Sequence, residues 1–476
     1  MNIAEIIFEE AKRHPDKVAI VRKDSQISYM EMVGVSKMIA GALKQYGVKP
    51  CDRVAFLCND GIEYVLFSLA ILSLGAAIIP MDSMLSDSEK KLIPEKMEAQ
   101  WLIAESSLSS LPTFGKILDL NNQKNLSKKF YFSKYEIPAE HREGYRYIQP
   151  AFIRFSSGTT GNSKGVVLSH ETIYARIVAA NKGLEITSSD VVVFSLSMSF
   201  HFVVSVLLFL YRGATILSCN LFMIAETLKR YRPTVMYGNP MDYYAILGSG
   251  EIYDDALKSV RLAVSTGVRL TPGLAREFYE FFAVRLTEAY GIIEVGLPFV
   301  HKQTGNFKTG FLGTPLPDFE VKCDSHGDVF LRGPGFFDAY FDPWIPYPLK
   351  KTDGWFHTGD VGTLDAKNCL TLKGRSTSVI NFLGYKIFPQ EVEDILNTHP
   401  DIAESLVCGK NNRLMDQTVH AQIVLKNPAK KLSANDIKDF CRPFLSGEKI
   451  PTSYTFVESL PKTLTGKLRR TGKFQD

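Results

Sequence analysis

The residues best suited to chemistry lie in one loop, Phe155 to Gly165, with the sequence FSSGTTGNSKG. The loop contains five hydroxyl side chains, three glycines and a lysine, and it separates two apolar segments, AFIRF and VVLS, that are typical of strands. Glycines let backbone N–H groups approach phosphate oxygens, hydroxyls donate hydrogen bonds, and Lys164 offers a cation. The composition of this loop therefore predicts a phosphate-binding site.

Other loop motifs fit this segment less well. Ser163 stands where the P-loop motif GxxxxGK[ST] requires glycine before the lysine, and the dinucleotide pattern GxGxxG is absent. Residues 161–165 match GxSxG, the serine-hydrolase elbow, but that elbow requires a helix after the turn. Because VVLS reads as a strand and no separate Asp and His motif is present, a hydrolase is the weaker interpretation. A plain hairpin turn would not explain so many hydroxyls.

Three further segments place charged residues beside glycines. YGIIE (290–294) puts Glu294 just beyond an expected glycine turn. HTGD (357–360) puts Asp360 after an expected tight turn, where a short carboxylate is suited to a ribose diol. PKTLTGKLRR (461–470) is a basic segment hinged at a glycine. Taken singly, each is equally well explained as a surface charge, a weak motif or a solvated tail.

The composition is that of a multidomain globular protein. At roughly 150 residues per domain, 476 residues suggest about three structural units. The hydrophobic fraction of 45% and the charged fraction of 22% exclude a disordered or fibrous chain. A net charge of +4 provides no basic field for nucleic acid. Seven cysteines without a CxxC pair fit neither a disulfide framework nor a zinc site, so we expect a reducing, cytoplasmic location.

Two apolar segments need to be separated from targeting and membrane signals. Residues 1–17 read as an acidic amphipathic helix and lack the charged start and apolar core of a signal peptide. The segment from Tyr64 to Met81 is uncharged, but Gly75 divides it into a helix of about three turns and a short strand, which is typical of a buried α/β unit. We therefore expect neither a signal peptide nor a membrane span.

Hydrophobic patterning predicts a large α/β domain, a β-rich subdomain and a small α+β domain. Apolar runs alternate with helix-like segments, which indicates parallel α/β layers, and Gly310 to Gly374 has the short strands of a β-rich region. Beyond Arg375, strand and helix patterns and a capping box of Ser433 with Asp436 predict the small domain. We expect domains at 1–375 and 376–476, joined by a short polar link that allows rotation. The runs are VAFLC (54–58), AAIIP (76–80), VVVFSL (191–196), ATILS (214–218) and VMYG (235–238).

Together and in this order, these segments resemble the adenylate-forming superfamily of acyl- and aryl-CoA ligases, luciferases and peptide-synthetase adenylation domains. The resemblance covers nearly the whole chain and extends to ISYMEM (27–32), residues 47–82, GDVFLRGPG (327–335) and residues 374–393. It implies a large domain that binds ATP and a carboxylic acid, and a small lid that rotates between two half-reactions. In the first, the acid attacks the α-phosphate of ATP and pyrophosphate leaves; in the second, a thiol attacks the acyl-adenylate.

The resemblance also implies a role for each residue of these motifs. Glu294 would bind Mg²⁺, an oxygen-seeking ion, together with Thr160. Asp360 would hold both ribose hydroxyls, with Arg375 assisting, and Lys467 would be delivered by the lid to bridge the α-phosphate and the carboxylate. The other contacts would come from Ser156, Ser157, Thr159, Thr160 and Lys164 around the phosphates, from Thr266, Gly267, Val268, Tyr290 and Gly291 around the adenine, and from Gly384 beside the thiol tunnel.

The acid is less closely defined. Amino-acid-activating members of the superfamily carry an Asp in the segment that matches 199–202, and here there is none. The Phe200-His201 pair instead resembles acyl- and aryl-CoA ligases, in which the histidine lines and gates the acid pocket; a buried structural histidine is the alternative. We expect an uncharged aryl or short to medium aliphatic acid, because the other pocket residues would be apolar: Val203, Leu207, Tyr237, Val268, Ile292 and Leu297.

Departures from the superfamily pattern leave two alternatives open. Ile293 replaces a Thr or Ser, so a hydroxyl contact to the α-phosphate worth about 1 kcal/mol or more is missing. Asn162-Ser163 replaces a residue–proline pair, Thr377 stands at the hinge, and Asn381 replaces a lysine. A nucleotide-binding relative without turnover is therefore one alternative. Loading of the phosphopantetheine arm of an acyl carrier protein, in place of the favoured CoA, is the other.

Overall fold

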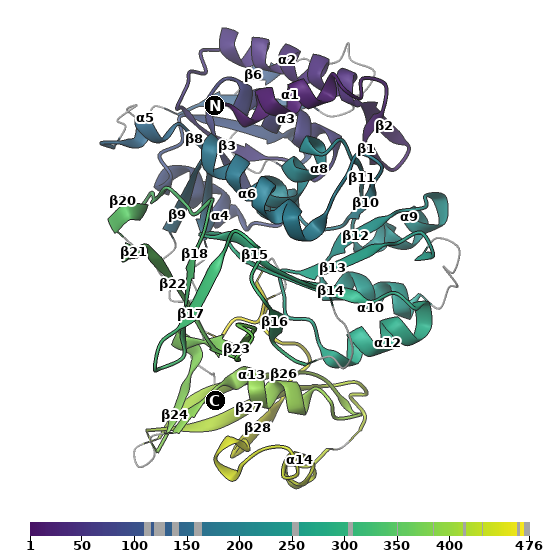
Figure 1. Cartoon of the computed structure of the whole chain (residues 1–476), viewed down its shortest axis with the longest axis vertical. Helices are drawn as coiled ribbons and strands as arrows, with labels where there is room; N and C mark the ends of the chain where they lie inside the picture. Colours follow the sequence, from purple (N-terminus) through teal and green to yellow (C-terminus); the bar gives the residue numbers. More distant parts are fainter. Residues whose placement is uncertain are drawn as a thin grey trace.

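The computed structural model describes the chain except for residues 109–115, 119–128, 136–141, 157–163, 250–256, 303–307, 350, 384, 413–415, 431, 464–466 and 471–476. Within the described residues the chain forms four sheets, three in the large domain and one in the small C-terminal domain, which lies at the lower end of Figure 1. The expected fold class is confirmed, whereas the exact boundary at residues 375 and 376 stays a prediction. None of the described helices is long and apolar enough to cross a membrane.

Two mixed sheets build the α/β part of the large domain. The five apolar runs form β3 (Arg53–Leu57), β4 (Ala77–Met81), β10 (Val191–Phe194), β11 (Thr215–Ser218) and β12 (Val235–Gly238), as predicted. The nine-stranded sheet has the order β20 (Ile345–Pro346), β19 (Ala339–Tyr340), β9 (Lys164–Ser169), β8 (Pro150–Ser156), β4 (Ala77–Met81), β3 (Arg53–Leu57), β5 (Trp101–Glu105), β7 (Phe130–Lys134) and β6 (Lys116–Leu118). The eight-stranded sheet has the order β15 (Gly296–Lys302), β14 (Leu286–Ile292), β13 (Leu262–Thr266), β12 (Val235–Gly238), β10 (Val191–Phe194), β11 (Thr215–Ser218), β1 (Val18–Arg22) and β2 (Ser25–Ser28). The strands from β14 to β1 in this sheet and from β8 to β5 in the other pair in parallel, and buried strands there are apolar on both faces.

Helices cover these sheets and contribute to one large and two smaller hydrophobic clusters. The uncharged segment predicted as helix and strand is α3 (Ile62–Ser73) followed by β4, with Gly75 at φ +72° between them. Residues 62–72 of α3 are all buried, which explains why the segment is apolar on every side. The other helices of the large domain are α1 (Ile3–Ala11), α2 (Tyr29–Gln45), α4 (Asp87–Lys96), η1 (Ser106–Leu108), α5 (Tyr145–Ile148), α6 (His170–Leu184), α7 (Met198–His201), η2 (Phe202–Val206), α8 (Leu207–Tyr211), η3 (Leu221–Met223), α9 (Ile224–Arg230), α10 (Pro240–Gly248), α12 (Pro272–Phe282) and η4 (Tyr347–Leu349).

The β-rich subdomain and the small domain follow in sequence. The subdomain sheet contains β16 (Phe311–Gly313), β17 (Glu320–Cys323), β18 (Asp328–Arg332), β21 (Lys351–Thr352), β22 (Trp355–Leu364) and β23 (Leu370–Arg375). The small domain has its own buried cluster and the predicted capping box of Ser433 and Asp436. Its elements are η5 (Ser376–Ser378), β24 (Ile380–Phe382), β25 (Tyr385–Ile387), α13 (Pro389–Leu396), β26 (Ile402–Asn412), β27 (Asp416–Leu425), α14 (Ala434–Cys441), η6 (Gly447–Lys449) and β28 (Ser453–Phe456). Strand β25 was not predicted.

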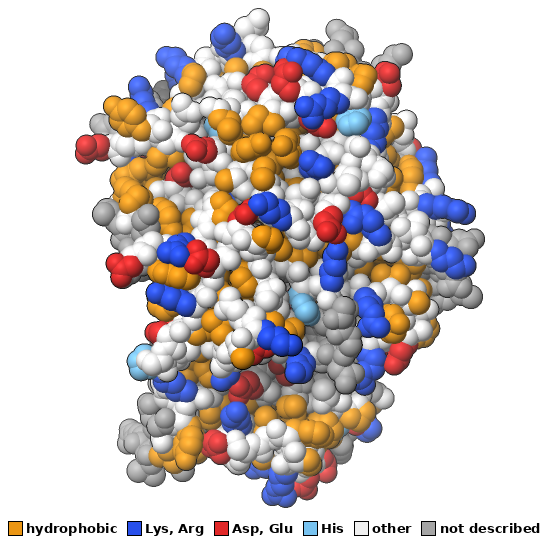
Figure 2. Space-filling model, in the orientation of Figure 1, with side chains coloured by type: hydrophobic (Ala, Val, Ile, Leu, Met, Phe, Trp, Pro, Cys, Tyr) orange, Lys and Arg blue, Asp and Glu red, His pale blue; other side chains and the backbone are white. Residues whose placement is uncertain are grey.

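Surface charge and cysteine chemistry agree with the composition. Figure 2 shows Lys and Arg side chains interspersed with Asp and Glu on the face in view. All seven cysteines are free thiols. Among the described residues, no group of three or more His, Cys, Asp or Glu side chains is arranged to hold a metal ion.

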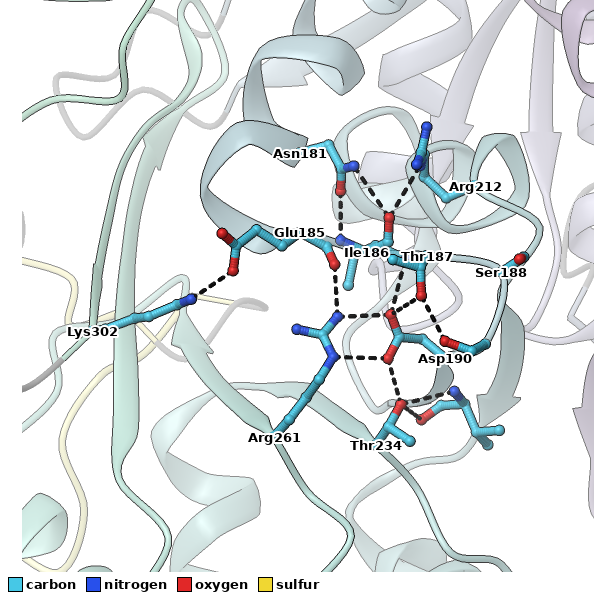
Figure 3. Close-up of polar contacts among 12 residues, drawn as sticks. Asn181, Glu185, Ile186, Thr187, Ser188, Asp190, Arg212, Thr234, Arg261 and Lys302 are labelled. Carbon is cyan, nitrogen blue, oxygen red and sulfur yellow. Dashed lines mark hydrogen bonds and ion pairs between the residues drawn. The ribbon is translucent and has the colours of Figure 1, made fainter.

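A buried carboxylate forms hydrogen bonds that join the residues just before three strands of the eight-stranded sheet (Figure 3). Asp190 is 2% exposed and accepts hydrogen bonds from Arg261 Nε at 3.0 Å, Arg261 Nη2 at 2.7 Å and Thr234 Oγ1 at 2.6 Å. Asp190, Thr234 and Arg261 immediately precede β10, β12 and β13. Burial acts to raise the pKa of Asp190, but hydrogen bonds from Arg261, Thr234 and Thr187 outweigh it and lower that pKa to about 2.

Replacing Asp190 with Asn is expected to lower the free energy of unfolding by about 3 kcal/mol, because Arg261 is left partly buried without its partner. The stability that ionised Asp190 confers is fully present above its ordinary pKa of 3.8 and is lost as the pH falls toward 2. Urea unfolding at pH 7 and at pH 3 measures both effects. The control is Glu185→Gln, which removes an exposed pair with Lys302 and should cost less than about 1 kcal/mol. Equal losses of unfolding free energy in the two variants would contradict the stabilising role assigned to Asp190.

Candidate active site

The predicted phosphate loop connects two antiparallel strands. Strands β8 and β9 pair with Ser156 opposite Lys164, so a strand, and not a helix, follows the loop, and the hydrolase elbow is excluded. The Nζ atom of Lys164 lies 4.7 Å from the centre of the Tyr340 ring. Ser157, Thr159, Thr160 and the Asn162-Ser163 pair lie outside the described residues, as does the side chain of Ser156. Their phosphate contacts stay predictions.

Glu294 lies in the turn between β14 and β15. The Tyr340 hydroxyl donates to Glu294 Oε1 at 3.2 Å, and the Phe337 N–H donates to the Glu294 carbonyl at 2.8 Å. The prediction of a turn at Gly291 was wrong, because Gly291 is part of β14. A Cβ atom at that position would lie 2.4 Å from the carbonyl oxygen of Gly296, so the close approach of the two strands requires glycine there. The turn itself is residues 293–295, and Glu294 is its middle residue.

Asp360 is held between two side chains from different strands. Its Oδ1 atom lies 2.9 Å from Arg375 Nε, and the Tyr290 hydroxyl donates to Oδ2. Burial raises the pKa of Asp360, whereas the charge of Arg375, the hydrogen bond from Tyr290 and the charge of Lys467 act in the opposite direction. The predicted tight turn before Asp360 was wrong. HTGD lies inside β22, where Gly359 kinks the strand at φ +74° and the pairing with β23 shifts register just beyond Asp360.

The adenine-side residues lie next to this carboxylate. Thr266 ends β13 and pairs with Ala289 of β14, so the 266–268 segment lies beside Tyr290. The Thr266 hydroxyl donates to the Ala289 carbonyl at 2.8 Å and joins the two strands. Gly267 has φ +81°, a left-handed conformation that favours glycine. Val268 follows in a bend and is partly buried. The sheet therefore brings together two segments that are more than twenty residues apart in sequence.

Lys467 reaches this site from the C-terminal segment. A bridge between Lys462 and Leu468 and a hydrogen bond from Lys467 N–H to Thr463 Oγ1 at 3.1 Å hold the described part of the segment. The Lys467 side chain is accessible to solvent, yet loss of hydration and the charges of Arg375 and Arg154 lower its pKa, while Asp360 and Glu294 oppose the shift. The ammonium group is therefore within electrostatic range of both candidate carboxylates. Gly384 lies outside the described residues.

The candidate acid pocket begins at His201, the last residue of α7. The π-helical turn η2 starts at the next residue, and such turns are frequent at functional sites. Burial, followed by the charges of Arg154 and Lys467, lowers the pKa of His201 to about 3, so its imidazole is neutral at physiological pH. The predicted wall is partly a packed core: Val203, Leu207, Tyr237 and Leu297 are buried in the main cluster, whereas Ile292 and Val268 are less buried.

Three residues of the site were missed by the sequence analysis. Tyr340 bonds to Glu294, and Thr358 accepts from the Asp360 N–H at 3.1 Å through Oγ1 and from Arg375 Nη1 at 2.9 Å through its carbonyl. Arg154 lies in the strand AFIRF and its charge acts on His201 and Lys467. A cation in an otherwise apolar strand was a signal for Arg154, whereas nothing local marked Tyr340.

A model of the AMP-binding enzyme family matches residues 7–341, and a model of the AMP-binding enzyme C-terminal domain matches residues 391–467. The chain belongs to the AMP-binding enzyme family. The resemblance to the adenylate-forming superfamily is thereby confirmed, and so is the expected class of enzyme, an AMP-forming acid–thiol ligase. The two matched regions contain the phosphate loop, YGIIE and Lys467. HTGD and Arg375 lie between them, in residues 342–390.

This AMP-binding enzyme is similar to CoA ligases over nearly its whole length. It is 26% identical to a 2-succinylbenzoate–CoA ligase from Bacillus subtilis, with 98% of this chain and 96% of that protein covered. It is 25% identical to a long-chain-fatty-acid–CoA ligase from the same species, with coverages of 98% and 92%. The solved O-succinylbenzoate coenzyme A synthetase from B. subtilis, in complex with AMP, has a TM-score of 0.84 at 24% identity and coverages of 99% and 98%, which shows the shared fold.

Proposed function

We propose that this enzyme uses ATP to convert an uncharged aryl or short to medium aliphatic acid into an acyl-adenylate and then transfers the acyl group to CoA. The observation that carries the proposal is that Lys467 lies within electrostatic range of Glu294 and of the Asp360–Arg375 ion pair, although these residues come from distant parts of the chain. The similarity to CoA ligases of different acids supports the thioester product and leaves the acid to be identified.

In the adenylation step, an oxygen of the acid attacks the α-phosphorus of ATP and the bond to pyrophosphate breaks. Asp360 and Arg375 would hold the ribose, Lys164 the outer phosphates, and Lys467 the reacting oxygens. Glu294 fits Mg²⁺, which binds through one or two carboxylates together with substrate phosphates, and its turn follows the strand that carries Tyr290. A bound Mg²⁺ ion would neutralise charge on the phosphate oxygens. Cations and oriented donors are needed there because the transition state concentrates negative charge.

The proposed function is tested by pyrophosphate release from Mg-ATP with aryl, short-chain and medium-chain acids, each with and without CoA. The Lys467→Ala variant is the blank. Acid-dependent release that CoA accelerates is the expected result. About one equivalent of pyrophosphate that is indifferent to CoA would support the carrier-protein alternative, because a tightly held adenylate then awaits another thiol. No release with any acid would contradict the proposal and favour the alternative without turnover.

Ile293 provides a separate prediction. Its side chain is partly buried against the main core, and it occupies the position where a hydroxyl is usual. Ile293→Thr should preserve or raise the rate of adenylation, by up to about fivefold for one added hydrogen bond of about 1 kcal/mol. Ile293→Val is the matched control, because valine has nearly the shape of threonine without the hydroxyl. A large fall in both variants would show that the site is packed around isoleucine.

A further inference from the structure

One face of the nine-stranded sheet presents a cation for which the proposed reaction scheme has no role. Arg154 of β8 pairs directly with Val166 of β9, and Val166 pairs directly with Tyr340 of β19. Residues that pair directly lie on the same face of a sheet, as do residues two apart in a strand. Arg154, Lys164 and Tyr340 therefore share one face, and the Tyr340 hydroxyl connects that face to Glu294.

Neutral contacts hold the Arg154 guanidinium beside the candidate acid pocket. Its Nη1 atom donates to the Phe200 carbonyl at 3.0 Å, and its central carbon lies 4.9 Å from the centre of the Phe200 ring. The next residue is His201. Within the part of the chain that the structure describes, no carboxylate lies within ion-pair distance of Arg154, and neither Nε nor Nη2 has an acceptor. A partly buried cation without a counter-ion is costly to keep unless a ligand supplies one.

The charges around Arg154 locate the missing anion. Burial lowers the pKa of Arg154 to about 10 and Glu294 opposes that shift, so the guanidinium stays charged at neutral pH. Arg154 in turn acts on both His201 and Lys467. It therefore lies among the groups assigned to the reacting carboxylate and the α-phosphate, on a strand that leads directly into the phosphate loop.

We infer that Arg154 is a further catalytic residue of the adenylation step, and that its guanidinium binds the carboxylate and α-phosphate oxygens that become joined in the acyl-adenylate. This inference rests on the proposed function. A carboxylate oxygen supplies the electron pair for the new oxygen–phosphorus bond. Pyrophosphate departs with the electrons of the bond that joined it to the α-phosphorus, and Arg154 keeps its proton throughout. Its unused N–H groups supply donors where Ile293, the residue before Glu294, has no hydroxyl.

The test compares Arg154→Met and Arg154→Lys, each alone and with Ile293→Thr. Removing one oriented donor at a developing anion typically costs about 100-fold or more in rate, so Arg154→Met should lose about that much in pyrophosphate release, and Arg154→Lys should recover part of it. Thiolysis of supplied acyl-adenylate should change by less than about threefold. Ile293→Thr should raise the activity of Arg154→Met by a larger factor than that of the unmodified enzyme, because the two groups serve the same oxygens.

Two further measurements separate failure of this inference from failure of the proposed function. Calorimetric binding of AMP and of adenosine needs no turnover. Arg154→Met should weaken the affinity for AMP by about tenfold and leave the affinity for adenosine unchanged, since only AMP carries the phosphate. Arg285→Met is the control. Arg285 is exposed, and its central guanidinium carbon lies 4.1 Å from the centre of the Tyr279 ring, a stacking contact similar to that of Arg154 with Phe200.

Two results would overturn the inference. The first is unchanged pyrophosphate release together with unchanged AMP affinity in Arg154→Met. The second is a rise in KM confined to acids with a second carboxylate, because Arg154 would then bind the tail of the acid. If the unmodified enzyme releases no pyrophosphate with any acid, the proposed function fails and the catalytic role fails with it, whereas the ratio of AMP to adenosine affinity still shows whether Arg154 binds the phosphate. Thermal unfolding of each variant separates loss of binding from loss of folding.

Discussion

Lys467→Ala is expected to slow adenylate formation by about 100- to 1000-fold while leaving ATP binding and thiolysis of supplied acyl-adenylate largely intact. The reason is that a cation aimed at the forming oxygen–phosphorus bond stabilises charge that appears only in the transition state. Lys467 lies within electrostatic range of Arg375, Arg154, Asp360 and Glu294, the groups to which we assign the first half-reaction. Single-turnover pyrophosphate release measures the first step, and acyl transfer from synthetic acyl-adenylate measures the second.

The control for this experiment is Lys462→Ala. Lys462 belongs to the same basic segment and forms an exposed ion pair with Glu404 at 2.6 Å. Removal of such a pair should cost less than about 1 kcal/mol of stability and should not affect either half-reaction. If Lys467→Ala slows both half-reactions equally, Lys467 has no selective role in adenylation, and the general loss would indicate that the segment holds the small domain in place.

Asp360→Ala is expected to weaken ATP binding by about 100-fold. Asp360 is buried, and both of its oxygens already have donors from Arg375 and Tyr290, so it accepts hydrogen bonds as an oriented anion. Each hydrogen bond to a charged group contributes about 1.5–3 kcal/mol, and two ribose hydroxyls would together account for the loss. The variant also leaves the Arg375 charge without its partner, which adds to the effect.

Comparison of ATP with 2′,3′-dideoxy-ATP isolates the ribose contact. The unmodified enzyme should prefer ATP by about 100-fold, and Asp360→Ala should abolish most of that preference, because the deleted carboxylate is the proposed acceptor of both hydroxyls. Asp365→Ala is the control: this exposed carboxylate accepts from the backbone N–H groups of Lys367 and Cys369 in the turn after β22. A preference for ATP that survives in Asp360→Ala would assign the ribose to other residues.

The two variants probe different halves of the site. Asp360 belongs to the β-rich subdomain and Lys467 to the C-terminal segment, and their charges interact. Loss of Asp360 is expected to appear mainly in nucleotide affinity, whereas loss of Lys467 is expected to appear mainly in the rate of adenylation. Because the two groups are coupled, the double variant should be less impaired than the product of the single effects.

Local patterns in the sequence were sufficient for most of the fold. The runs at 54–58 and 235–238 are short, apolar and bounded by turn residues, and burial on both faces of a parallel sheet requires that composition. The helix and strand around Gly75 were predictable for the same reason, since a left-handed residue ends the helix. Turn geometry was less predictable: HTGD and Gly291 read as turns but lie within strands, because glycine also serves at kinks and at close strand contacts.

By itself, the sequence determined the family, the α/β architecture and the residue types that could bind nucleotide, because motif spacing and hydrophobic periodicity are local properties of the chain. Only the tertiary structure decided which of those residues meet. Strand pairing places Arg154 in line with Tyr340, the hydroxyl of Tyr340 joins Glu294, and the C-terminal segment brings Lys467 to carboxylates more than 100 residues away. Such contacts depend on how buried faces pack against one another, and no short window of sequence contains both partners.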